Sequence, residues 1–188
     1  MKRCPWCEGN DLTIKYHDED WGVPVHEERK HFEFLTLEAA QAGLSWLTIL
    51  RKRENYRSAY NQFDPRIIAG YDEKKVETLI RNEGIVRNRK KIEASVNNAR
   101  RFLEIQDRWG SFDRYIWEFV DGKPVVNAWR ELSEIPCRTE LSDKISKDLK
   151  QRGFQFVGGL IIYSHLQATG LINDHLVSCF RYKELVSH

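Results

Sequence analysis

Five residues near the two ends of the chain have the types and the spacing of metal ligands. His175 and Cys179 are four positions apart, so both side chains lie on one face if this segment is helical. Cys4, Cys7 and His17 lie close together near the amino end, and two of them would complete a set of four. Nitrogen and sulfur ligands without a carboxylate are typical of a structural zinc ion. The sequence therefore favours one closed zinc site that joins the chain ends, although Cys4 and Cys7 alone are also compatible with an incidental thiol pair.

Apart from these metal-ligand candidates, Glu38 has surroundings that suggest a chemical role. In a helix over residues 33–42, Phe34, Leu35 and Ala42 lie on the same face as Glu38. Loss of hydration on such a face raises the pKa of a carboxyl group unless a positive partner favours the ion. Either outcome makes Glu38 unusual, and the ordinary alternative is a structural ion pair with an arginine from elsewhere in the chain.

A turn directly follows the expected Glu38 helix. Gly43 fits the position that ends a helix, and Ser45 fits the N-cap of a second helix that begins near Trp46. This turn would present Leu44 as an apolar tip beside Trp46, with the basic run at 51–53 close behind. The alternative is that Leu44 and Trp46 are ordinary core residues.

Residues 84–88 form a second short connection, between an expected helix over 73–82 and another over 89–106. The backbone amides at the start of the second helix, together with Arg87 and Arg89, form an arrangement that suits a phosphate group. Helical hairpins are common, but the basic residues around this tip favour contact with a polyanion.

The remaining chain shows helical periodicity and cap signals, without a convincing run of alternating strand character. We expect coil and turns over residues 4–31 and a long loop over residues 121–138. Further helices are expected after Asp64 and Ser111, over residues 142–151 and 160–169, and after Asp174, where the last helix would carry His175 and Cys179. The sequence thus predicts an all-α protein.

Length and charge place the chain among proteins of one domain or two small lobes. Its 188 residues include 30 basic and 28 acidic side chains, and the cations cluster at 51–53, at 87–91 and at 100–101. The amino end does not resemble an export signal, and no apolar run is long enough to span a membrane. We therefore expect a cytoplasmic protein, without a membrane partner, whose cysteines are ligands or buried thiols and not disulfides.

Five segments together resemble bacterial 3-methyladenine DNA glycosylase I. They are YHDEDWGVP at 16–24, LEAAQAGLSWLTILRKRENY at 37–56, GIVRNRKKIEA at 84–94, GFQFVGG at 153–159 and GLINDH at 170–175. The resemblance runs from residue 4 to about residue 179 and implies an all-α helix-hairpin-helix glycosylase fold, with the termini joined by one structural zinc. It implies one domain over residues 1–188, and is compatible with a hairpin lobe over about 60–110 and a termini lobe of about 1–55 with 140–180.

The resemblance also implies an activity and a set of site residues. The activity is hydrolytic excision of 3-methyladenine from alkylated double-stranded DNA by a monomer, without a redox or nucleotide cofactor. The zinc ligands would be Cys4, His17, His175 and Cys179, the catalytic residue Glu38, and the base-binding residues Tyr16, Trp46, Trp6 and Trp21. The DNA contacts would come from Gly43, Leu44, Gly84, Val86, Arg87 and Arg89. Two positions depart from the family pattern, because Cys7 lies outside the ligand set and Thr13 stands where members carry a tyrosine.

Two other functions remain compatible with the residues alone. In a bifunctional glycosylase and lyase, Lys90 or Lys91 would attack the sugar and Asp107 would assist. In a zinc-stabilised DNA-binding module, the hairpin and the metal ligands would act without catalysis. The module does not account for Glu38 among apolar neighbours, and the resemblance implies a family without the lysine and aspartate pair.

Overall fold

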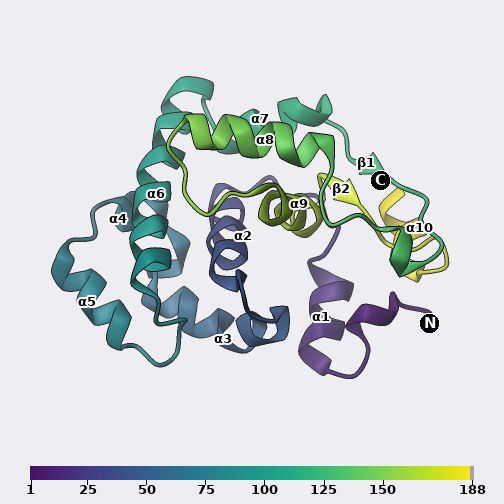
Figure 1. Cartoon of the computed structure of the whole chain (residues 1–188). Helices are drawn as coiled ribbons and strands as arrows, with labels where there is room; N and C mark the ends of the chain where they lie inside the picture. Colours follow the sequence, from purple (N-terminus) through teal and green to yellow (C-terminus); the bar gives the residue numbers. More distant parts are fainter. Residues whose placement is uncertain (187–188) are drawn as a thin grey trace.

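The helix α2 (Glu28–Gln41) lies at the centre of the molecule and carries Glu38 (Figure 1). The structure, a computed structural model, describes residues 1–186, so positions 187 and 188 of the expected domain lie outside the described residues. Every residue of α2 from 31 to 40 is buried. The helix packs against α3 (Trp46–Ala59), α6 (Arg89–Trp109), α7 (Phe112–Trp117) and α9 (Gly159–Ala168). A helix that is enclosed on all sides belongs to the core.

The other elements surround this central helix. The remaining α-helices are α1 (Asp11–Glu19), α4 (Pro65–Ala69), α5 (Glu73–Arg81), α8 (Glu140–Gln151) and α10 (Phe180–Val186). The described part of the chain also has short 3-10 helices, namely η1 (Pro5–Cys7), η2 (Asn61–Phe63), η3 (Glu118–Val120) and η4 (Leu132–Glu134). In Figure 1, α4, α5 and α6 lie on one side of α2, and both chain ends lie on the other with α1 and α10. Within the described residues, no helix combines the length and the apolar character needed to cross a membrane.

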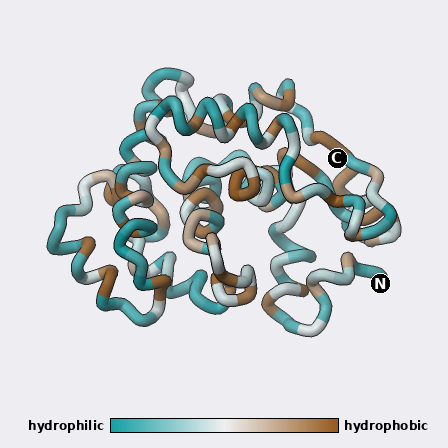
Figure 2. The backbone as a smooth tube through the Cα atoms, in the orientation of Figure 1, coloured by the Kyte–Doolittle hydropathy of each residue, from teal (hydrophilic) through white to brown (hydrophobic). Residues whose placement is uncertain are grey.

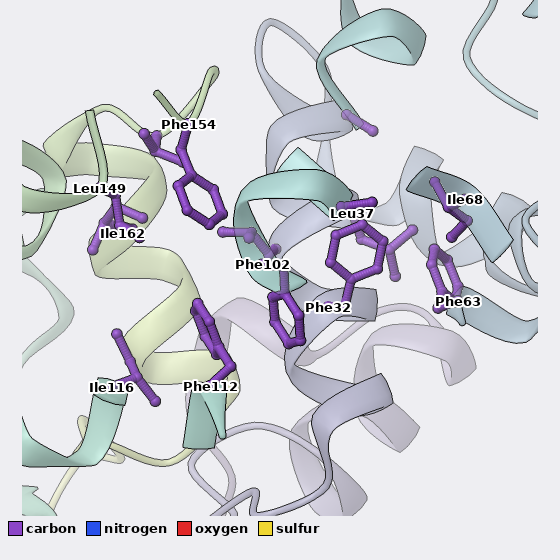
Figure 3. Close-up of a cluster of buried hydrophobic side chains, with 14 of the residues drawn as sticks. Phe32, Leu37, Phe63, Ile68, Phe102, Phe112, Ile116, Leu149, Phe154 and Ile162 are labelled. Carbon is purple, nitrogen blue, oxygen red and sulfur yellow. The ribbon is translucent and has the colours of Figure 1, made fainter. Parts of the chain in front are cut away.

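The main core forms where α2, α6, α7, α8 and α9 meet (Figure 3). The rings of Phe102 and Phe112 stack with centroids 4.3 Å apart, and Phe32 of α2 meets Phe102 edge-on at 5.3 Å. Figure 2 shows hydrophobic stretches of α2 and α9 in the middle of the molecule. Burial of one such ring stabilises the fold by about 1.5–3 kcal/mol. The resulting rigid frame fixes α2.

Glu28 ties the start of α2 to the start of α7. Its carboxylate accepts hydrogen bonds from the amides of Phe112 and Asp113, at 3.0 and 2.8 Å. These amides belong to the first turn of α7, where backbone N–H groups have no partner inside the helix. The first turn of the Glu38 helix is therefore anchored in the core.

The mostly helical structure confirms the local cap signals. The side chains of Asp64, Asp72 and Ser111 accept hydrogen bonds from backbone amides at the starts of α4, α5 and α7, and Ser45 does so for α3. The helix expected over 33–42 begins earlier, at Glu28, because its first turns are polar and the apolar periodicity becomes visible only later.

The prediction of coil and turns over residues 4–31 is wrong. This segment contains η1 and α1, whose N-cap Asn10 accepts a hydrogen bond from the amide of Leu12. The first turns of α2 also fall in this range. The helix α1 has few aliphatic residues, so hydrophobic periodicity does not reveal it, and it is held instead through buried Tyr16 and His17.

The prediction of a helix carrying His175 and Cys179 is also wrong. The residues between β2 (Ile172–Asn173) and α10 are irregular, with a turn at 177–178, and α10 begins only at Phe180. Asp174 does not cap a helix, because its buried carboxylate accepts hydrogen bonds from four side chains. The donors are Asn127, Trp129, Tyr163 and Gln167.

The expected loop over residues 121–138 contains structure that the sequence did not indicate. It includes η4 and the strand β1 (Val125–Val126), which pairs in parallel with β2 through Val125 and Ile172. Strands of two residues each are too short to give an alternating pattern. The pairing attaches this loop to the segment that precedes His175.

Gly170 allows two distant segments to approach each other closely, and its replacement provides a test of the fold. Its φ is +70°, and an added Cβ would lie 2.3 Å from the Val23 carbonyl carbon and the Pro24 nitrogen. Gly110 also has a positive φ, of +85°, but an added Cβ there would meet nothing within 4 Å. We predict that Gly110→Ala costs about 1–2 kcal/mol of unfolding free energy and that Gly170→Ala costs about 2 kcal/mol more, because backbone must also move.

Urea denaturation of both variants measures this difference. Equal losses in Gly170→Ala and Gly110→Ala would contradict the close approach of Gly170 to the segment after α1.

Candidate functional site

Glu38 and four aromatic residues line one cavity of about 420 Å³. The ring centroids of Tyr16 and Trp46 are 5.2 Å apart, and those of Trp6 and Trp21 are 4.9 Å apart. These rings come from α1, the start of α3, η1 and the turn after α1. The structure thus brings together all five residues that the resemblance implies for the base pocket. Walls of this kind suit a flat, electron-poor ring.

The Glu38 carboxylate is buried and unpaired. The residue is 3% exposed, and within residues 1–186 its side chain makes no hydrogen bond or ion pair. Burial raises the pKa of Glu38 to about 8, because a charged carboxylate loses its hydration there. Burial, and secondarily the nearby Glu38, also raises the pKa of Tyr16 well above its ordinary value, so the phenol keeps its proton.

Glu33, in the same helix, shows that cations are available nearby. It is also buried, but its Oε1 accepts from Arg53 Nε at 2.6 Å and from Arg57 Nη2 at 2.9 Å. Among residues 1–186, two arginines pair with Glu33 and none pairs with Glu38. The ordinary alternative of an Arg-paired Glu38 is therefore excluded in this structure, and the cavity keeps an unused hydrogen-bond acceptor.

Five further residues line the cavity without having been assigned a role from the sequence. They are Gln41, Leu132, Ile135, Ser164 and Gln167. Gln41 lies one turn after Glu38 on α2, so helical spacing from Glu38 could have predicted it as a cavity residue. The other four come from the irregular loop and from α9, and only the fold brings them to the cavity.

A second cluster joins the two chain ends. Cys4, His17, His175 and Cys179 are all buried, and one ligand atom from each lies within 4.8 Å of the others. Cys179 Sγ lies 3.4 Å from His17 Nε2 and 3.5 Å from His175 Nδ1. Cys4 Sγ lies 3.7 Å from His175 Nδ1. Two thiols and two imidazoles in this arrangement have the composition of a closed tetrahedral metal site.

Neighbouring groups orient both histidines. His17 Nδ1 lies 2.7 Å from Asp18 Oδ1, and Arg3 in turn forms a salt bridge with Asp18 at 2.8 Å. His175 Nε2 lies 2.9 Å from the carbonyl oxygen of Trp21. Such contacts to the outer nitrogen are typical of metal-binding histidines, since they fix the tautomer and the ring orientation.

Cys7 lies beside this cluster but not in it. Its thiol donates to the carbonyl oxygen of Cys4 at 3.1 Å, and burial raises its pKa to about 11. Thr13, the other departure from the family pattern, donates its hydroxyl to the carbonyl oxygen of Cys7 at 2.7 Å. Both departures therefore contribute to the packing of the amino-terminal segment.

The cluster and the cavity share a wall. Tyr16 lines the cavity and its neighbour His17 belongs to the cluster. Trp21 also lines the cavity, while its carbonyl oxygen contacts His175 and its ring lies edge-on to the His175 ring at 4.6 Å. The position of the aromatic wall therefore depends on how the chain ends are joined.

The turn after α2 presents Leu44 at the surface. Gly43 has φ of +79°, as its expected position requires, and Leu44 is 39% exposed. The alternative that Leu44 is a core residue is therefore excluded. Trp46, at the start of the next helix, lines the cavity, so the apolar tip and the cavity are adjacent.

Backbone amides of the hairpin between α5 and α6 donate hydrogen bonds to side chains of the protein. The amide of Gly84 donates to Asn82 Oδ1 at 2.8 Å, and that of Val86 donates to Tyr56 Oη at 3.1 Å. Both basic side chains at the tip are exposed and paired with carboxylates: Arg87 with Glu83, and Arg89 with Glu73, Glu77 and Glu93. Exposed pairs of this kind are weak and can exchange for a phosphate.

The fold, the cavity and the cluster agree with one class of protein. The model of the methyladenine glycosylase family matches residues 6–182. The chain belongs to this family.

Individual relatives extend over nearly the whole chain. It is 49% identical over 182 residues to DNA-3-methyladenine glycosylase 1 of Escherichia coli K12, covering 97% of both chains. A crystal structure of a 3-methyladenine DNA glycosylase I has a TM-score of 0.92 at 50% identity, covering 95% of this chain and 98% of that one. A structure of the Staphylococcus aureus 3-methyladenine DNA glycosylase I, which concerns its recognition of 3-methyladenine, has a TM-score of 0.92 at 38% identity over 96% of both chains.

The raised pKa of Glu38 predicts a specific dependence of stability on pH. The folded protein holds this proton more tightly than the unfolded chain does, so Glu38 lowers the unfolding free energy as pH rises from about 4.5 to about 8. The slope has an upper limit of about 1.4 kcal/mol per pH unit. Glu38→Gln cannot lose a proton, so the variant is expected to lack this decline and to be more stable than the wild type above pH 8.

Urea unfolding at several pH values between about 5 and 9 measures the effect. Glu54→Gln, at an exposed site on α3, removes a carboxylate without burial and should keep the wild-type profile. Parallel profiles for the wild type and Glu38→Gln would contradict the raised pKa.

Proposed function

We propose that this protein is a monofunctional DNA glycosylase that removes 3-methyladenine from alkylated double-stranded DNA by hydrolysis and leaves an abasic site. Membership of the methyladenine glycosylase family and the names of the relatives support this function. The observation that carries it for this chain is the unpaired, buried Glu38 in an aromatic cavity of about 420 Å³. We further propose that the enzyme acts as a monomer in the cytoplasm.

The chemistry of the substrate explains why an unpaired carboxylate suffices. Methylation at N3 makes the adenine of the nucleotide cationic and therefore a good leaving group, so the enzyme needs recognition more than a strong nucleophile. A nucleotide flipped out of the duplex places its base between aromatic walls such as Trp46 and Tyr16. A nearby cation favours the charged form of Glu38, so the carboxyl group would lose its proton as the cationic base enters. The resulting carboxylate can accept a charge-assisted hydrogen bond from the exocyclic amine.

The two alternative functions have less support. Lys91 Nζ donates to the carbonyl oxygens of Ala40 and Ala42, and so is not free to attack a sugar. Lys90 is exposed and does not line the cavity, and Asp107 is exposed at the polar end of α6. A DNA-binding module without catalysis would have no use for the cavity around Glu38. These features favour hydrolysis over the lyase reaction and over binding alone.

DNA contacts would come from the two turns beside the cavity. We propose that Leu44, presented by Gly43, fills the gap in the base stack after the nucleotide is flipped, as apolar wedges do in other proteins that distort DNA. In the hairpin, the amides of Gly84 and Val86 are used within the protein, so these residues would position Arg87 and Arg89, which would exchange their carboxylate partners for a phosphate. These contacts do not depend on the DNA sequence, which suits an enzyme that must find damaged bases anywhere in DNA.

We propose that Cys4, His17, His175 and Cys179 hold one structural zinc ion. The donor set, the burial of all four residues and the oriented imidazoles fit zinc. Four protein ligands leave no position for substrate, so the ion would contribute folding free energy by joining α1 to the segment before α10.

The proposed zinc site predicts different results for two buried cysteines. Cys179→Ser is expected to lose most of the metal and to lower the melting temperature, because a hydroxyl is a poor zinc ligand. Cys7→Ser should keep one zinc per chain, since the Cys7 thiol points to the Cys4 carbonyl oxygen and not into the cluster. Elemental analysis and thermal unfolding measure both quantities. Loss of metal in Cys7→Ser with retention in Cys179→Ser would contradict the proposed ligand set.

The proposed role of Glu38 predicts a moderate loss of activity. Glu38→Gln keeps the shape of the side chain but removes a charge-assisted hydrogen bond worth about 1.5–3 kcal/mol. Excision of 3-methyladenine from duplex DNA should therefore slow by roughly ten- to a hundredfold. Single-turnover kinetics on methylated DNA measure this rate, and affinity for abasic DNA provides the control, because it should not change. Unchanged excision would contradict base recognition by Glu38, and a covalent DNA adduct lost only in this variant would make Glu38 a nucleophile instead.

A further inference from the structure

Lys91 connects the hairpin to the end of the Glu38 helix. It stands in the first turn of α6, and its Nζ donates to the carbonyl oxygen of Ala40 at 2.8 Å and to that of Ala42 at 2.6 Å. Both acceptors belong to the last turn and the cap of α2. The side chain therefore spans from the helix that follows the hairpin to the residues immediately before Leu44.

The bonds of Lys91 complete the support of the Leu44 turn. The last carbonyl groups of a helix have no partner inside it, and a positive charge near them is favourable. Within the turn, the amide of Leu44 donates to the Gln41 carbonyl oxygen at 2.7 Å, and Gln41 Nε2 donates to the Leu44 carbonyl oxygen at 3.0 Å. Together with Lys91, these bonds fix the backbone on both sides of Gly43 while the Leu44 side chain stays exposed.

Lys91 differs from the other cations around the hairpin. Arg87 and Arg89 are exposed and pair with carboxylates, and Lys90 is also exposed. Lys91 is half-buried, and its Nζ donates hydrogen bonds to backbone carbonyl oxygens. Burial lowers the pKa of Lys91, which agrees with an ammonium group that is partly removed from solvent. Its position is that of an internal brace and not that of a surface charge.

We infer that Lys91 is a positioning residue that holds the turn at Gly43 and Leu44 in a fixed position relative to the hairpin. Leu44 then enters the base stack when the hairpin contacts the DNA backbone. It acts through Leu44 and neither attacks the sugar nor serves mainly as a phosphate ligand. The inference rests on the proposed glycosylase function and adds to it the coupling between the two DNA-contacting turns.

Lys91→Gln and Lys90→Gln form a matched pair that separates bracing from charge. Both remove one positive charge from adjacent positions, so any general loss of DNA affinity should occur in both. Only Lys91→Gln removes the brace. We expect Lys91→Gln to slow excision from duplex DNA by about tenfold more than excision from single strands, which need no wedge. Lys90→Gln should affect duplex and single strands equally, and both variants should bind free 3-methyladenine as the wild type does.

A double-mutant cycle with Leu44→Ala tests whether Lys91 acts through the tip. Leu44→Ala should reduce excision from duplex DNA more than from single strands, without a large drop in melting temperature. In the Leu44→Ala background, Lys91→Gln should then cost little more, because residues that act as a unit are not additive. If Lys91→Gln lowers the melting temperature too far to assay, Lys91→Met keeps the aliphatic part of the side chain and serves in its place.

Several results would overturn the inference. Equal behaviour of Lys91→Gln and Lys90→Gln on duplex DNA would reduce Lys91 to a surface charge. Additive effects with Leu44→Ala, or an equal loss on single strands with weaker binding of the free base, would mean that Lys91 does not act through the tip. Absence of 3-methyladenine release by the wild-type protein would instead contradict the proposed function, so the two failures are distinguishable.

Discussion

Removal of the Glu38 carboxylate from water is the constraint on which the arrangement of this molecule depends. A buried carboxyl group without a partner favours unfolding at neutral pH, and its pKa rises to about 8. The surrounding structure must therefore hold it in place. Phe32 of α2 packs against the Phe102 and Phe112 stack, Glu28 anchors the start of α2 to α7, and Lys91 binds the carbonyl groups at its end. Perturbed titratable groups of this kind concentrate at functional sites, and the nearby Glu33, which receives two arginines, shows the ordinary structural alternative.

The amino-terminal segment has a different source of stability. It contributes Trp6, Tyr16 and Trp21 to the cavity but has few aliphatic residues with which to pack. Its fixed points are the second hydrophobic cluster and the four buried Cys and His side chains, which bring α1 against the segment before α10. Because Tyr16 and His17 are adjacent, the side of α1 that faces the cavity is fixed by the side that faces the cluster. The shape of the cavity wall at α1 thus depends on the cluster that joins the chain ends.

Local signals in the sequence were sufficient where the interaction itself is local. Asp72 and Ser45 cap helices within a few residues of their own positions, and Gly43 ends α2 with the positive φ expected of it. The irregular structure at 174–179 was not predictable in this way, because the Asp174 carboxylate accepts hydrogen bonds from residues that are distant in sequence, such as Asn127 and Tyr163. For the same reason Leu132 and Gln167 were not identified as cavity residues. The predicted roles of Trp6 and Trp21 came from family resemblance and not from any local pattern.

The ionisation of Glu38 provides the most direct test of this account. Carbon-13 NMR of the Glu38 side-chain carboxyl, assigned by comparison with Glu38→Gln, follows its titration in the free protein and with 3-methyladenine bound. We predict a midpoint near pH 8 in the free protein and a lower midpoint with the base bound, because hydrogen bonds to the carboxylate favour its charged form. A midpoint at about pH 4 to 5, unchanged by the base, would be that of an ordinary solvated glutamate and would contradict the account.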